Sequence, residues 1–170
     1  MSTPEWWQRG PVPDVPAPLQ PVAHILLQVR DSVGELAEGL TEAQWNARPA
    51  SVASAAFHVR HIAGVIDRLF TYARGESLSD AQFGTLRAEG DHLALEDVPA
   101  ALDALRSRVD AALAQLRATD PATLADARSV GRARLPSTVI GCLVHGAEHA
   151  MRHVGQLSVT ARVVRGGTRS

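Results

Sequence analysis

The apolar residues of this 170-residue chain recur at three- and four-residue steps in four long segments. This period places one face of an α-helix against a core, and the segments cover about residues 20–39, 52–74, 98–118 and 136–164. The second segment is apolar on several faces, which predicts that it is widely buried. We find no stretch of alternating apolar and polar residues that competes with these helices. The pattern therefore predicts an all-α four-helix bundle with short connections.

Capping and helix-breaking residues separate the four segments. Residues 41–44 are typical of the capped start of a short turn, and residues 79–82 can begin a short helix. The third helix is expected to end just before Pro121, and residues 120–135 to form a polar connection. Pro136 suits the first position of the last helix, because proline needs no hydrogen-bond partner there.

The first 21 residues contain six prolines, a density that prevents a regular helix and favours extended backbone. They also contain Trp6 and Trp7, whose large aromatic surfaces gain free energy on burial. We therefore expect an N-terminal arm, residues 1–19, that docks on the body of the protein or on a second subunit. The bundle itself is expected to span residues 20–165, and residues 166–170 to form a flexible tail.

Composition excludes several classes of protein. The 17 basic and 18 acidic residues give a net charge of −1, and no basic stripe favours a nucleic acid as partner. The start of the chain lacks the features of a secretion signal, and no apolar run is long enough to span a membrane. Cys142 is the single cysteine, so the chain cannot form an internal disulfide. These features predict a cytoplasmic protein.

Histidines give the chain its candidate chemistry. His145, His149 and His153 follow one another at four-residue steps, so their imidazoles line one stripe of the last helix. Two imidazoles one turn apart can chelate a transition metal, and His149 and His153 are the first candidates. A third ligand can come from His58 or His61 on the second helix; His61 is preferred, although spacing alone does not decide between them. Three histidines with an open position are typical of a catalytic metal.

Other polar residues near this stripe can shape a pocket. His145 lies one turn before the chelating pair, and Gln156 lies on nearly the same face. Either side chain can orient a metal ligand, a water or a substrate from outside the coordination sphere, and His58 can do the same if it is not a ligand. Arg68 flanks the histidines of the second helix and can hold an anionic substrate group.

Two motifs resemble a known family. The sequence F-H-V-R-H-I-A-G at 57–64 and the sequence E-H-A-M-R-H-V-G-Q at 148–156 resemble the DinB/YfiT-like metal-binding family. The resemblance extends to residues 19–24, to 67–75 and to the start of the last helix, and so covers most of the chain.

The resemblance implies an up-down-down-up four-helix bundle. The apolar faces of the second segment and the two tryptophans of the arm are more apolar surface than one small bundle can bury, which predicts a homodimer, and the resemblance points the same way. It also implies His61, His149 and His153 as the ligands of one divalent metal, Zn²⁺ or Ni²⁺. Known relatives include transferases and isomerases that use bacillithiol, mycothiol or glutathione.

The sequence supports three hypotheses about function. The first is a metal-dependent enzyme, either a thiol S-transferase in which a thiolate attacks an electrophilic small molecule, or a hydrolase. The second is a non-catalytic, stress-associated metal-binding protein that is dimeric. The third is a dimerising helical module whose histidines only pack in the core. A metal assay separates the third from the others, and a screen with thiols and electrophiles separates the first from the second.

Overall fold

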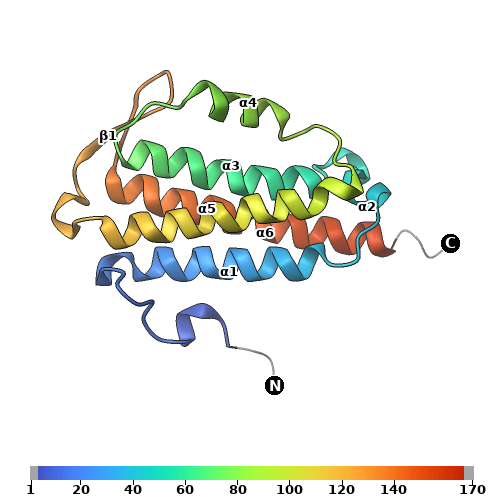
Figure 1. Ribbon diagram of the computed structural model, residues 1–170, viewed down its shortest axis with the longest axis horizontal. Coiled ribbons are helices and arrows are strands. Elements are labelled where there is room, and N and C mark those ends of the chain that lie inside the picture. Colours follow the sequence, from blue (N-terminus) through green and yellow to red (C-terminus); the bar gives the residue numbers. More distant parts are fainter. Residues whose placement is uncertain (1–3, 167–170) are drawn as a thin grey trace.

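In the computed structural model, which describes residues 4–166, four long helices form the bundle that the apolar pattern predicts. They are α1 (Gln20–Ala37), α3 (Ala55–Ala73), α5 (Val98–Ala118) and α6 (Val139–Gly166). Helices α3 and α5 run in the direction opposite to α1 and α6, which is the up-down-down-up order (Figure 1). Helix α6 packs against α1 and α3, and α5 packs against the same two helices.

Two short helices occupy the connections where capping sequences predicted them. They are α2 (Glu42–Asn46) and α4 (Asp80–Ala88), and both begin with a complete capping box, at Thr41 and Ser79. Helix α4 lies along the outer side of α3, within the long connection that lets α5 run parallel to α3 (Figure 1). Single 3₁₀ turns complete the helical structure, at Trp6–Gln8, Ala17–Leu19, Pro49–Ser51, Leu95–Asp97 and Pro121–Thr123.

The inward faces of the four long helices form one apolar core. Its largest fully buried side chains include Leu26, Val29, Ile62, Ile66, Leu105, Leu116, Leu143 and Leu157. Trp45 of α2 and Leu93 of the α4–α5 connection close one end of this core. Within residues 4–166, no helix is both long and apolar enough to cross a membrane.

The connection before α6 contains a β-hairpin that the sequence pattern did not predict. Strand β1 (Ala127–Val130) pairs antiparallel with β2 (Leu135–Thr138), so Pro136 lies in a strand and the prediction that it begins the last helix is wrong. The strands have four residues each and are largely exposed, which leaves too little apolar alternation to detect. Helix α6 begins instead after Thr138, whose hydroxyl accepts a hydrogen bond of 3.1 Å from the Gly141 amide.

Other helix boundaries differ from the predicted ones by one to three residues; α1, for example, ends at Ala37 and not at residue 39. Helix α3 begins at Ala55 and not at residue 52, because the Ser54 hydroxyl accepts a hydrogen bond from the Phe57 amide and caps the helix. Helix α6 continues to Gly166, two residues beyond the predicted end. The predicted tail at 166–170 lies, except for Gly166, outside the described residues.

The N-terminal arm docks on α1 through Trp6. The Trp6 Nε1–H donates a 2.7 Å hydrogen bond to Asp31, and the guanidinium of Arg9 covers the ring at 4.3 Å. Trp6 is partly buried against the core, whereas Trp7 is 66% exposed, so only one of the two tryptophans of the arm packs on this chain. Val12 and Val15 join the core, and the division of the chain at residue 20 stays a prediction.

Candidate metal centre

The three histidines that the sequence singles out come together between α3 and α6. His61 projects from the first half of α3, whereas His149 and His153 lie one turn apart on α6. Each offers a ring nitrogen, and the three nitrogens lie within 4.8 Å of one another. Because α3 and α6 pack together along their lengths, residues about ninety positions apart in sequence become neighbours.

The spacing of the nitrogens suits one shared metal ion. His61 Nε2 lies 3.1 Å from His149 Nε2, and the ring centroids of His61 and His153 are 4.3 Å apart. Two nitrogens bound to a tetrahedral zinc at about 2.0–2.1 Å lie about 3.3 Å from each other. The side chains are therefore placed so that a small inward adjustment brings three nitrogens onto one ion.

The environment keeps two of these imidazoles neutral. Burial, together with the neighbouring charge of His61, lowers the pKa of His149, and the same causes lower the pKa of His153 to about 4. Neutral imidazole is the form that binds metals. In addition, His149 Nδ1 is buried and has no hydrogen-bond partner among residues 4–166. The donor set thus fits a divalent transition metal.

His58 lies beside the three histidines and contacts one of them. Its Nδ1 is 3.0 Å from the Nδ1 of His153, and its side chain is buried. Burial, with a smaller contribution from the charge of His61, lowers the pKa of His58 to about 4. His58 is not among the three residues whose nitrogens converge, so the geometry favours His61 over His58 as the third ligand.

His145 and Gln156 are more distant from the convergence point. His145 is exposed, meets the ring of His149 edge-on at 5.3 Å and lies 3.6 Å from Glu148. Gln156 is exposed and lines a cavity of about 460 Å³, together with His58 and Arg152. Apolar side chains, among them Val52 and Val159, form much of its remaining wall. Because His58 contacts both the cavity and His153, a small molecule in this cavity would lie next to the histidines.

Glu89 is the residue of the site that sequence reasoning missed. Its carboxylate accepts a 2.7 Å hydrogen bond from His61 Nδ1 and forms a 2.6 Å ion pair with Arg68. Arg68, expected to hold an anionic substrate, is therefore occupied by the protein's own carboxylate. Glu89 follows α4 in a connection without periodic pattern, so no sequence signal placed it near His61.

The pKa of Glu89 is set by opposing effects. Burial acts to raise the pKa of the carboxyl, but the hydrogen bonds from His61 and Arg68 and the charge of Arg68 outweigh it. The pKa of Glu89 therefore lies below its ordinary value, and the group is a carboxylate at neutral pH. It is negative, acceptor-only and fixed by two partners.

These observations define the class: an up-down-down-up bundle with a three-histidine cluster, able to hold a metal ion, between α3 and α6. Comparison with known families agrees with that class. A sequence profile of the DinB superfamily matches residues 25–157, which is more than half of the chain, and the chain belongs to this superfamily. No curated protein matches the chain significantly.

Proposed function

We propose that this chain binds one divalent metal, Zn²⁺ or Ni²⁺, through His61, His149 and His153. The observation that carries the proposal is the convergence of three imidazole nitrogens from two helices within 4.8 Å. The lowered pKa values of His149 and His153 support it, because they leave the ligands neutral at pH 7. Three protein ligands leave at least one position for water or substrate.

We further propose that the chain uses this centre to transfer a low-molecular-weight thiol to an electrophilic small molecule. A divalent ion in such a site lowers the pKa of a thiol, or of a water, toward neutrality. In the transfer, the thiolate sulfur forms a bond to the electrophilic carbon, and the leaving group departs with its electron pair and takes up the proton that the thiol lost. A thiol cosubstrate suits the reducing cytosol that we expect for this chain.

Residues of the chain itself would position the two reactants. The 460 Å³ cavity between His58 and Gln156 is of a size for a small molecule and opens beside the histidines. Its apolar wall would contact the body of the electrophile, and the Gln156 amide can orient a polar group. Arg152 lines the same cavity, but two hydrogen bonds to Glu148 of 2.6 and 2.7 Å already hold its guanidinium. The cavity therefore favours an electrophile without a strong negative charge.

The metal proposal is tested by elemental analysis of purified protein. Wild type is expected to bind about one equivalent of Zn²⁺ or Ni²⁺, and the His149→Ala variant to bind none, because two imidazoles rarely retain a metal against dialysis. His24→Ala is the matched control, since this histidine of α1 bonds to the carbonyl of Gly10 in the N-terminal arm. Full metal content in His149→Ala would overturn the assignment.

The transfer proposal is tested by turnover. Metal-loaded wild type and His149→Ala are incubated with bacillithiol, mycothiol or glutathione and a panel of model electrophiles. Wild type should form conjugate with at least one thiol, and the variant should show the uncatalysed rate. Metal-dependent release of product without any thiol would favour a hydrolase, and equal rates with every thiol would favour a non-catalytic metal-binding protein.

We also propose that the protein is a homodimer, although the first reason for expecting one no longer applies. The apolar faces of α3 are covered by the chain itself, mainly by α6 and α5. What supports a dimer is the set of exposed valines on α6, namely Val144, Val159 and Val163. Light scattering at micromolar concentrations should give twice the 18.1 kDa chain mass. A constant monomer mass would contradict the proposal.

A further inference from the structure

Glu89 is held in an unusual position for a carboxylate. It is the C-terminal cap residue of α4, and only 3% of its surface is exposed. One carboxylate oxygen meets His61 Nδ1 at 2.7 Å and the other meets Arg68 Nη1 at 2.6 Å. A buried carboxylate is costly unless both oxygens have partners, so the contacts with His61 and Arg68 are what allow Glu89 to lie here.

Helix α3 provides the space for this carboxylate at Gly64. A side chain at position 64 would overlap Oε1 of Glu89, and its Cβ would lie 2.6 Å from Arg68 Nη1. Glycine lowers helix propensity by about 1 kcal/mol relative to alanine, so its presence inside α3 has a cost. The cost is explained by the close approach of Glu89, because His61, Gly64 and Arg68 follow at three- and four-residue steps on one face of α3.

The chain after Glu89 is also fixed in place. Arg60 Nη1 donates a 2.6 Å hydrogen bond to the carbonyl of Asp91, and Asn46 exchanges two hydrogen bonds of 2.8 Å with the backbone of Leu93. The segment is therefore held at both α3 and α2. Glu89 approaches His61 from a backbone that is already ordered.

This geometry determines which nitrogen of His61 is free. A carboxylate can only accept, so the hydrogen on the His61 ring resides on Nδ1. The other nitrogen, Nε2, then carries a lone pair, and it is the nitrogen that faces His149 at 3.1 Å. The Arg68–Glu89–His61 chain is thus directed at the centre of the histidine cluster.

We propose that Glu89 is a positioning residue of the metal centre: it holds the proton on His61 Nδ1 and so presents Nε2 to the ion. This inference rests on the proposed metal site. By accepting the hydrogen on Nδ1, Glu89 makes Nε2 of His61 a stronger electron-pair donor to the metal. Arg68 and Gly64 make the buried carboxylate possible, the first by its charge and the second by the space it leaves. Since Glu89 belongs to the α4 connection and not to the bundle, the docking of that connection and the affinity for metal are coupled.

The first test compares metal affinities by competition with a chromophoric chelator. Glu89→Ala should bind Zn²⁺ about 10–100-fold more weakly than wild type, the range found when an outer partner of a ligand is lost. Glu89→Gln keeps an oxygen that can accept from Nδ1, so its loss should be smaller. Glu96→Ala, which removes an exposed acid of the same connection, should bind as wild type does. Visible absorption of the Co²⁺ forms reports whether the coordination geometry changes as well.

The second test needs no metal. It begins with the wild-type protein, so its result stands even if the Glu89→Ala variant fails to fold. Nitrogen-15 shifts of the imidazole rings in metal-free wild type should place the proton of His61 on Nδ1, and Glu89→Gln, which removes the charge but keeps the shape, should weaken this preference. A proton on Nε2 in wild type would overturn the proposal. Equal metal affinity in Glu89→Ala and wild type would also overturn the role of Glu89. That result would not count against the metal site itself. Absence of metal binding by wild type would instead refute the proposed function, and the tautomer would still decide the role of Glu89.

Discussion

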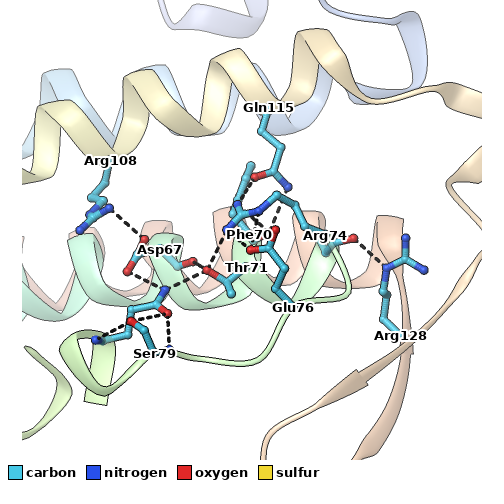
Figure 2. A network of polar contacts seen from close by, with 11 residues as sticks. Asp67, Phe70, Thr71, Arg74, Glu76, Ser79, Arg108, Gln115 and Arg128 are labelled. Carbon is cyan, nitrogen blue, oxygen red and sulfur yellow. Dashed lines mark hydrogen bonds and ion pairs between the residues drawn. The ribbon is translucent and has the colours of Figure 1, made fainter. Parts of the chain in front are cut away.

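Helix α3 carries two polar clusters of different character, one around His61 and one around Thr71. In the second cluster, Thr71 donates to the carbonyl of Asp67 and accepts from Gln82, both at 2.8 Å, and Arg108 pairs with the Asp67 carboxylate at 3.0 Å. The close-up of this cluster shows donors and acceptors matched across α3, α4 and α5 (Figure 2).

The same cluster continues to the end of α3. Arg74 donates to Gln115 of α5 at 2.6 Å and to Glu76 at 2.8 Å, and Arg128 of β1 donates to the carbonyl of Ala73 at 2.7 Å (Figure 2). Gln115 also donates to the carbonyl of Phe70 at 3.0 Å, so the carbonyls of Phe70 and Ala73, among the last of the helix, gain side-chain partners from other elements. The cluster around Thr71 is therefore a structural joint between elements.

The cluster around His61 is matched only in part: Glu89 pairs with His61 and Arg68, but His149 Nδ1 is buried without a partner among residues 4–166. Ring nitrogens face one another at 3.1 Å between His61 and His149 and at 3.0 Å between His58 and His153. The pKa values of His58 and His153 are lowered to about 4, so neutral rings face each other and not ion pairs. Polar groups that are satisfied by one another join helices, whereas three ring nitrogens that converge within 4.8 Å, beside a buried nitrogen without a partner, offer a place to a ligand.

Removing metal should expose this difference most strongly. If wild type is saturated at about 100 times Kd, a strong chelator should lower its free energy of unfolding by about 2.7 kcal/mol. For a chain of this size the melting temperature should then fall by about 5–10 °C, because each kcal/mol shifts it by about 2–4 °C. Calorimetry with and without chelator measures the shift. His149→Ala should melt at one temperature in both conditions, and a chelator effect of equal size in that variant would contradict the prediction.

Gly64→Ala should damage the histidine cluster without changing a polar group. The added methyl overlaps the Glu89–Arg68 pair, so we expect a cost of about 1–3 kcal/mol in unfolding free energy and roughly tenfold weaker metal binding. Urea unfolding and chelator competition measure the two effects. Gly34→Ala is the control: nothing lies within 4 Å of a Cβ at this helical position, so the change should stabilise by up to about 1 kcal/mol and leave metal affinity unchanged. Wild-type affinity in Gly64→Ala would show that the pair is dispensable.

Thr71→Val should damage the other cluster alone. It removes the hydroxyl while keeping the shape, so Gln82 and Arg74 lose an acceptor, at an expected cost of about 1–2 kcal/mol in unfolding free energy. Metal affinity should not change. Thr85→Val on α4 is the matched control, because its exposed hydroxyl bonds only to the carbonyl of Ala81. If Thr71→Val weakens metal binding as much as Gly64→Ala, the two clusters are not separable.

Much of the architecture could be predicted from the sequence. The segment predicted at 98–118 is α5 as the structure has it, and the capping sequences at 41–44 and 79–82 begin α2 and α4. The choice of His149 and His153 as neighbours likewise followed from a four-residue step. These features depend on residues within one or two turns of each other, and the helical period expresses such relations directly.

Tertiary structure decided the rest. It placed His61, and not His58, at the convergence of the nitrogens, and it brought Glu89 to His61 across 28 positions. It also formed the hairpin that contains Pro136, whose short exposed strands lack an apolar pattern. Periodicity reports which face of a helix is buried, but not which distant side chain meets it. The sequence by itself therefore determined the helices and the histidine stripe. Packing of α4 on α3 determined that the carboxylate of Glu89 meets His61, because this contact depends on the space left by Gly64 and on the buried charge of Arg68.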